Sequence, residues 1–263
     1  MSVRDNLGIR MKENYEKISR TKLMRRTPVA LRIDGKAFHT FTRGFAKPFD
    51  DVLVKCMQET TKYLCENIQG CVFGYTQSDE ITLILIDYQT LTTSAWFDYE
   101  VQKICSISSS MATLKFNLEF GKILSNFNKF KNNGNENVVD YGEYYKALYS
   151  KGAMFDSRCF NIPKEEVCNL IFWRQIDAIR NSIQMVGRSY FSAKELDHKS
   201  QRDIQDMLHK QFNVNWNDYP TYLKRGSACI KTENGWIIDK DMPILKNEDR
   251  DYVEKLIYID SEK

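Results

Sequence analysis

Histidine and proline are scarce in this sequence, and long apolar runs are missing. The 263 residues include three histidines and five prolines, and no C-x-x-C or H-E-x-x-H spacing occurs, so the sequence gives a zinc site little support. No apolar run reaches the roughly 18 to 20 residues of a membrane span, and the N-terminus lacks the apolar core of a signal peptide. Several of the seven cysteines lie in apolar periodic segments, a pattern that fits a reducing compartment. We therefore expect a soluble, cytoplasmic protein.

Charge is distributed unevenly along the chain. The formal net charge of +3 is too small to indicate nucleic-acid binding by itself. Residues 1–28 carry eight basic against three acidic residues, whereas residues 232–263 carry nine acidic against five basic residues. The basic N-terminal segment is either a phosphate-binding surface or a solvated run of charge. Its basic residues are Arg4, Arg10, Lys12, Lys17, Arg20, Lys22, Arg25 and Arg26.

Hydrophobic periodicity predicts an alternating order of strands and helices. Apolar runs of strand length alternate with segments whose apolar residues recur every three to four positions. The predicted elements are a strand at 29–34, a helix at 50–68, strands at 71–75 and 81–86, a helix at 93–118 and a strand at 154–162. The order is therefore β-α-β-β-α-β, with a polar loop around residues 132–137.

This order predicts an α+β fold, a split βαβ sheet of the ferredoxin-like type with helices on one face of an antiparallel sheet. Residues 163–211 read as a helical C-terminal extension, and residues 226–231 and 236–240 form a hairpin around an Asn-Gly turn signal. We expect a single domain over residues 1–240, which includes the basic N-terminal segment, and an acidic tail over residues 241–263.

Two acidic residues occupy equivalent positions in this predicted topology. Asp34 ends the first strand, and Asp79 lies in the turn between the second and third strands. If the first and third strands are neighbours, both carboxylates reach the same edge of the sheet, where they repel each other unless a cation lies between them. Mg²⁺ selects such oxygen ligands, and paired ions of this kind serve phosphoryl transfer. The alternative is that both acids only cap turns.

Three sequence blocks resemble the signature motifs of the tRNA-histidine guanylyltransferase superfamily. They are Leu31–His39 (LRIDGKAFH), Phe45–Asp50 (FAKPFD) and Gly74–Glu80 (GYTQSDE). Weaker similarity continues through Phe155–Arg158, Trp173–Ala178 and Tyr222–Ser227, so the resemblance covers roughly residues 5–230.

The resemblance implies a palm-like polymerase that adds nucleotides to the 5′ end of tRNA. It implies two Mg²⁺ ions held by Asp34, the Gly35 carbonyl and Asp79, with Lys47 and Ser78 as further catalytic residues. GTP, ATP and other nucleoside triphosphates are the implied substrates, and a triphosphate first activates the 5′ monophosphate of the tRNA. The 3′-hydroxyl of an incoming nucleotide then attacks that activated end. A homotetramer is the implied assembly.

A triphosphate carries about four negative charges, and basic side chains near the acid pair are candidates to neutralise them. The predicted nucleotide-binding set is Arg32, Lys36, Ala37, Phe38, His39, Asp50, Lys103, Arg158, Asn181, Lys224 and Arg225. Three members also have an alternative without a nucleotide contact. His39 could be an ordinary half-buried histidine, Lys103 could belong to the polar face of its helix, and Asn181 could be a polar helix residue. Strand alternation points Glu80 away from Asp79, which favours a supporting role for Glu80. No aromatic residue is assigned to base stacking.

One departure from the superfamily pattern bears on specificity. The enzymes that act on tRNA-histidine carry a His-Ile-Asn-Asn segment after the Trp-Arg-Gln block, whereas this chain reads DAIRNSI over residues 177–183. The missing histidine favours the guanylyltransferase-like branch, which is associated with templated repair of truncated tRNA 5′ ends. The rivals are a tRNA-histidine-specific enzyme that adds one G, a palm-type nucleotide cyclase, and a non-catalytic RNA-binding module.

Overall fold

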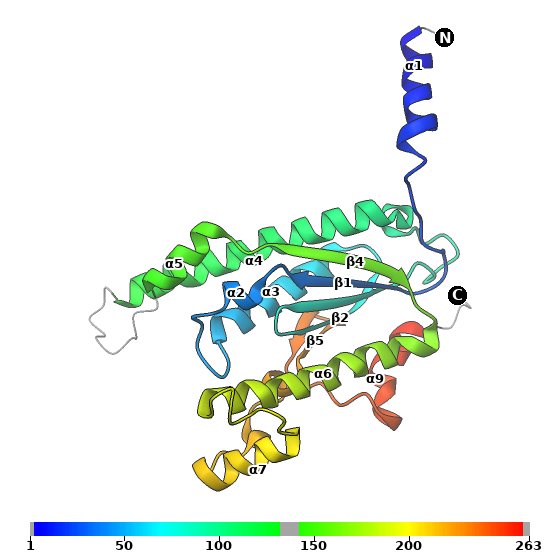
Figure 1. Cartoon of the computed structure of the whole chain (residues 1–263). Helices are drawn as coiled ribbons and strands as arrows, with labels where there is room; N and C mark the ends of the chain where they lie inside the picture. Colours follow the sequence, from blue (N-terminus) through cyan, green and yellow to red (C-terminus); the bar gives the residue numbers. More distant parts are fainter. Residues whose placement is uncertain (1–2, 132–141, 260–263) are drawn as a thin grey trace.

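The computed structural model describes residues 3–131 and 142–259, and its centre is one antiparallel sheet (Figure 1). The strand order is β4-β1-β3-β2-β5-β6. The strands are β1 (Val29–Gly35), β2 (Cys71–Gln77), β3 (Glu80–Leu85), β4 (Phe155–Asn161), β5 (Ser227–Thr232) and β6 (Gly235–Asp239). The predicted fold class is confirmed, and the β1–β3 adjacency on which the acid pair depends is present.

Two helices cover the first face of the sheet, as predicted. They are α3 (Asp51–Asn67) and α4 (Val101–Lys131). Side chains alternate between the two faces of a strand, so Leu31 and Ile33 of β1 point into the same core as Leu83 of β3. Met57 of α3 and Phe116 of α4 pack against them, and all five residues are almost completely buried.

The C-terminal part of the chain covers the second face. α6 (Lys164–Tyr190) and α9 (Asp251–Ile257) pack there on Phe73 and Ile84 (Figure 1). The prediction of an acidic tail over residues 241–263 is wrong for its described part, because Leu245, Val253 and Ile257 are buried in this second core. The acidic residues lie between these apolar positions, so charge composition concealed a packed segment.

The remaining described elements surround this body. A small third core joins the end of α6 to α7 through Ile183, Val186, Ile204 and Leu208. α1 extends away from the sheet (Figure 1). The elements outside the sheet and its four covering helices are α1 (Val3–Met11), a π-helix (Lys12–Glu16), α2 (Phe38–Phe41), α5 (Gly142–Lys151), α7 (Gln201–Phe212), α8 (Thr221–Arg225) and 3₁₀ segments at Trp96–Tyr99, Trp216–Asp218 and Asn247–Arg250.

The second long helix differs from its prediction. It was expected over residues 93–118, but α4 starts at Val101 and continues to Lys131. Phe97 and Asp98 have left-handed backbone angles in a 3₁₀ segment, and the chain is joined there to the N-terminal segment by a bridge between Lys22 and Glu100. The polar loop predicted around residues 132–137 lies outside the described residues. Within residues 3–131 and 142–259, no helix is both long and apolar enough to cross a bilayer.

Candidate active site

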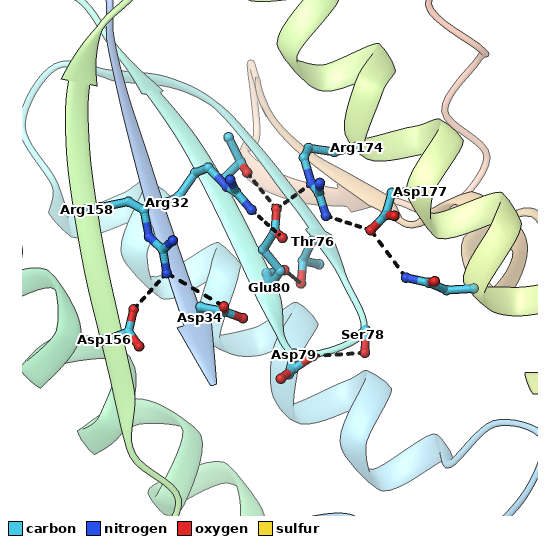
Figure 2. Close-up of polar contacts among 12 residues, drawn as sticks. Arg32, Asp34, Thr76, Ser78, Asp79, Glu80, Asp156, Arg158, Arg174 and Asp177 are labelled. Atoms are coloured by element: carbon cyan, nitrogen blue, oxygen red, sulfur yellow. Dashed lines mark hydrogen bonds and ion pairs between the residues drawn. The ribbon is translucent and has the colours of Figure 1, made fainter. Parts of the chain in front are cut away.

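The two predicted acids meet at one edge of the sheet. β1 ends at Gly35, and the turn at residues 78–79 joins β2 to β3 at the same edge. Asp34 lies opposite Glu80 in the β1–β3 register, and the Gly35 N–H donates to the Asp79 carbonyl over 3.1 Å. This bond ties the hairpin turn to the end of β1. Figure 2 shows Asp34 on β1 and Asp79 in the neighbouring turn.

Burial and neighbouring charges raise the pKa of both carboxyl groups. For Asp34, burial is the largest cause, and the charges of Glu80 and Asp156 add to it. For Asp79, burial again dominates and the charge of Asp34 adds, while the Ser78 hydroxyl, which donates to Asp79 Oδ1 over 3.0 Å, acts in the opposite direction. A cation between the two groups would remove this penalty.

The donor set at this edge fits Mg²⁺. In the described part of the chain, no three His, Cys, Asp or Glu side chains gather closely enough to hold a metal ion. The acid pair therefore provides two carboxylates, and further ligands have to come from a backbone carbonyl such as that of Gly35, from water or from substrate phosphate. Mg²⁺ accepts this mixture because it retains waters and binds few protein carboxylates.

A third carboxylate and an arginine flank Asp34 on strand β4. Asp156 is paired with Asp34 in the β1–β4 register, and the Arg158 guanidinium lies 3.1 Å from Asp156 Oδ1 and 3.7 Å from Asp34 Oδ2. The structure thus brings the predicted Arg158 to the site. Asp156 was missed, although it lies in the same sequence block, two residues before Arg158 and on the same strand face.

Glu80 is part of a buried ionic network and not of the acid pair. Its carboxylate accepts bonds from Arg32 Nη2 over 2.7 Å and from Arg174 Nε over 2.8 Å (Figure 2). The side chains of Glu80 and Arg174 are each 7% exposed. Arg174 also binds Asp177 over 2.8 Å. The assignment of Arg32 to the triphosphate is therefore corrected, because Glu80 neutralises this arginine inside the fold.

The segment that follows β1 forms one wall of a cavity beside the hairpin turn. The cavity has a volume of about 310 Å³, and His39, Lys47 and Ser78 line it. His39 and Lys47 are exposed rather than half-buried. Lys36, also exposed, lies at the start of this segment, and the left-handed backbone of Ala37 (φ 55°) turns the chain from β1 into α2.

Two residues of this segment have structural roles that sequence reasoning missed. The Phe38 side chain is buried in an aromatic cluster and lies so close to Gly35 that a Cβ there would be 2.3 Å from its ring. Asp50 accepts bonds from the N–H of Ala46 and Leu53, caps α3, and accepts from a tyrosine hydroxyl of α5. Both side chains are used inside the fold, so a nucleotide contact at Phe38 or Asp50 would have to come from the backbone, and the two assignments stay predictions.

A smaller cavity of about 70 Å³ adjoins the first on the α6 side. Asn181 lines it together with Ser78, and Asn181 Nδ2 donates to Asp177 Oδ2 over 3.2 Å. Lys224 and Arg225, at the end of α8, lie close by but point elsewhere. Lys224 Nζ donates to the backbone carbonyl of Asn217 over 2.5 Å. Arg225 Nε donates to the backbone carbonyl of Met242, which follows β6, over 3.3 Å. Burial, followed by the Arg225 charge, lowers the pKa of Lys224.

Lys103 is at the wrong end of the sheet for a nucleotide contact. Thr113 of α4 accepts a bond from the Phe155 N–H, and Phe155 is paired with Gly35 at the active edge. Lys103 precedes Thr113 by ten residues, or about 15 Å along the helix. It lies 3.7 Å from Glu100 and is half exposed. The prediction of a nucleotide contact at Lys103 is therefore wrong, and the alternative of a polar helix face describes it.

Comparison with known proteins assigns the chain to a protein family. Residues 9–163 match the family model described as tRNAHis guanylyltransferase. The chain belongs to the tRNAHis guanylyltransferase family. This is a family of nucleotidyltransferases that act in tRNA processing, so the predicted enzyme class is confirmed.

Individual relatives in this family are similar over most of their length. A bacterial tRNA(His) guanylyltransferase (Thg1)-like protein in complex with ATP is 42% identical with a TM-score of 0.82, and the match covers 96% of this chain and 100% of that one. A bacterial Thg1-like protein in complex with GTP is 39% identical with a TM-score of 0.76, over 97% and 100% of the two chains. The probable tRNA(His) guanylyltransferase of Dictyostelium discoideum is 26% identical over 80% of this chain and 77% of its own.

The raised pKa of Asp79 predicts a gain in stability when its charge is removed. A carboxyl group whose folded pKa lies above its unfolded value destabilises the fold as the pH rises above the unfolded pKa, near 4. We expect Asp79→Asn to raise the melting temperature at pH 7 in the presence of a chelator, and to raise it less at pH 3.5, below the unfolded pKa. The amide oxygen of Asn can still accept the Ser78 bond.

Thermal melting at the two pH values measures this effect. The exposed Asp241→Asn is the matched control, because it removes the same charge far from the acid pair and should leave both melting temperatures unchanged. A lower melting temperature for Asp79→Asn at pH 7 without metal would contradict the assigned charge repulsion.

Proposed function

We propose that this protein adds nucleotides in the 3′-to-5′ direction to the 5′ end of truncated tRNA, guided by the opposite strand. The carrying observation is the acid pair at the end of β1 and in the β2–β3 turn, placed beside two adjoining cavities. Membership of the tRNAHis guanylyltransferase family and the similarity to bacterial proteins bound to ATP and GTP support this reading.

The groups that would hold two Mg²⁺ ions are Asp34, Asp79 and the Gly35 carbonyl. When bound, the ions supply positive charge for the substrate phosphates and favour deprotonation of the attacking hydroxyl. The protein contributes the position of the two carboxylates, because the 3.1 Å bond between Gly35 and Asp79 holds the turn against the strand. The ionic network around Glu80 lies directly behind that turn and keeps β3 and α6 together.

The two cavities are the proposed nucleotide site. Lys47 and His39 bring exposed basic groups to the larger cavity, where they contact phosphate, and Ser78 lies between both cavities and the acid pair. Asn181 offers an amide in the smaller cavity. The 5′ monophosphate of the tRNA first attacks the α-phosphate of ATP or GTP and takes up a nucleoside monophosphate, pyrophosphate leaves, and Lys47 supports this activation step. The 3′-hydroxyl of the next nucleoside triphosphate then attacks the 5′ phosphate, and the activating monophosphate leaves.

A homotetramer is the proposed assembly. Its support in this chain is an apolar groove of about 580 Å³ between α4, α5 and β4. The side chains of Leu114, Leu118, Tyr149 and Met154 line it and are each about half exposed. Contiguous exposed apolar surface of this kind often marks a protein contact.

The test of this function is template dependence. The protein is incubated with Mg²⁺, all four nucleoside triphosphates and several tRNA bodies that lack their first nucleotide and differ only in the base opposite the gap. We expect each to be extended by the nucleotide complementary to that base. The reason is that Ile179 and Arg180 replace part of the segment found in the tRNA-histidine enzymes, which leaves Watson–Crick pairing to select the base.

Intact tRNA-histidine and a reaction without tRNA are the controls. Addition of G whatever the opposing base, or activity on tRNA-histidine alone, would establish the tRNA-histidine-specific enzyme instead. Release of a cyclic nucleotide without tRNA would establish a cyclase. Binding of tRNA without any extension would leave a non-catalytic RNA-binding protein.

A further inference from the structure

An open sheet face lies on the other side of the acid pair from the cavities. α6 packs on β3 and β2, and the second core beneath it includes Ala30 of β1 but none of the residues of β1 and β4 at the Asp34 edge. On these two strands, Asp156 and Arg158 are 60% and 55% exposed and Asp34 is 42% exposed. We call the surface formed by Arg32, Asp34, Asp156 and Arg158 the open face. It is polar, shallow and next to the proposed reaction centre.

A tryptophan of α6 borders the open face. The Trp173 ring centroid lies 4.4 Å from the Arg174 guanidinium and 5.5 Å from that of Arg32. Both guanidinium groups bind the Glu80 carboxylate, so both lie on the side of the ring that faces the sheet. Trp173 is nevertheless 52% exposed. One side of the indole is therefore held in place by buried charges, and the rest is open to a ligand.

This arrangement fits the end of an RNA duplex. Arg32 precedes Asp34 by two residues on the same strand face, about 7 Å along β1, and its guanidinium contacts the indole. A base stacked on Trp173 therefore has its phosphate within a nucleotide's length of Asp34, where Arg158 offers an exposed positive charge. Bases stack well on aromatic side chains held in this manner.

The choice of the RNA end over a nucleotide follows from shape. The cavities lined by Lys47, Ser78 and Asn181 are hollows of about 310 and 70 Å³ that adjoin at the turn. In the part of the chain that the structure describes, the open face has no second wall, because Trp173, about half exposed, borders it from α6 alone. A duplex end is broad and flat, so it needs only one surface to stack on and one surface beside it that binds the backbone.

We propose that Trp173 is a stacking platform for the terminal base pair of the acceptor stem, and that Arg158 binds the adjoining backbone phosphate. This inference rests on the proposed function, since it places the RNA substrate of that reaction. Trp173 acts as a positioning residue: it holds the duplex end so that the 5′ phosphate reaches the acid pair.

The test uses a short acceptor-stem RNA hairpin that lacks its first nucleotide and carries 2-aminopurine as the base opposite the gap. Its fluorescence reports stacking at the duplex end, and a titration gives the affinity. We compare wild type with Trp173→Leu, which keeps an apolar side chain beside Arg32 and Arg174 but cannot stack, and with Trp173→Phe, which can. Ile176→Ala is the matched control on the same helix face.

Trp173→Leu should bind the hairpin about 5- to 150-fold more weakly, the range measured when a single base–aromatic stack is removed. Trp173→Phe should recover most of the affinity and the fluorescence change, and Ile176→Ala should retain both. The KM for the nucleoside triphosphate should stay unchanged in all three variants. The loss in Trp173→Leu should be the same at low and high salt, whereas the loss in Arg158→Gln should shrink as salt rises.

Wild-type affinity and fluorescence in a folded Trp173→Leu variant would overturn the platform, as would a loss that disappears at high salt. A changed molecular mass of Trp173→Leu in solution with unchanged RNA binding would instead assign the tryptophan to a protein contact. Failure of the proposed function looks different, because wild type would then extend no truncated tRNA, whatever the state of Trp173. Melting curves of each variant separate loss of fold from loss of stacking.

Discussion

Asp34→Asn should lower the rate of nucleotide addition to truncated tRNA by at least about a hundredfold and leave the protein folded. Loss of groups that only support metal ligands already costs about 10- to 100-fold, so loss of a ligand itself should cost more. The substitution also removes a carboxylate whose pKa is raised by burial and by neighbouring acids, so the fold without metal should not suffer. Single-turnover extension of a 5′-truncated tRNA measures the rate.

The matched control is Asp156→Asn on the neighbouring strand. It removes an equivalent carboxylate from the same sheet face, paired with Asp34 in register, but from a side chain that is 60% exposed and bound to Arg158. We expect a much smaller loss from it. Similar losses in both variants would place the metal between Asp34 and Asp156, and full activity of Asp34→Asn would refute the acid pair as the reaction centre.

Glu80→Gln should lower the free energy of unfolding by about 3–5 kcal/mol, the cost of breaking a buried ion pair from one side. Glu80 is almost completely buried, and its carboxylate neutralises both Arg32 and Arg174. The neutral amide removes the carboxylate that Arg32 binds and leaves Arg174 with Asp177 alone. Equilibrium unfolding in urea measures the change, and the exposed Glu233→Gln should stay within about 0.5 kcal/mol of wild type.

A second variant separates lost charge pairing from lost packing. In Arg32→Met, Glu80→Leu, Arg174→Met, all three charges are replaced by apolar groups of similar size, and such replacements are often neutral or stabilising. We expect this triple variant to be more stable than Glu80→Gln alone. The opposite result would be a triple variant whose loss of unfolding free energy equals the sum of the losses in the three single variants. The three charges would then act independently and would not form one network that holds β3 to α6.

Several features of the site follow from local sequence pattern. Alternating apolar residues in residues 29–35 and 80–85 set which side chains enter the first core, and this alternation already directed Glu80 away from Asp79. The order of strands and helices placed Asp34 and Asp79 at one edge once β1 and β3 were taken as neighbours. Both inferences use the side-chain periods of a strand (two residues) and of a helix (3.6 residues). These periods can be read from a short stretch of sequence.

Other features depend on segments that are far apart in the chain. The partner of Glu80 on α6 is Arg174, 94 positions away, and no local pattern distinguishes Arg32 as its ion-pair partner from Arg32 as a phosphate ligand. Phe38 and Asp50 were assigned to the nucleotide because they lie in motif blocks, but packing against α4 and α5 uses both side chains. Lys103 was assigned to the triphosphate for its charge alone, and local sequence does not give its distance from the Asp34 edge. The start of α4 was also misjudged by eight residues.

The sequence by itself therefore determined the fold class, the family and the acid pair, because period, turn signals and motif spacing are properties of short segments. Only the tertiary structure decided which charges are free for substrate, because a side chain's partners are set by the elements that pack across from it. It also showed that residues 241–259 complete the second core and that Trp173 borders an open sheet face beside Asp34. Burial is decided by the whole fold, since an apolar or charged residue becomes buried only when a distant segment covers it.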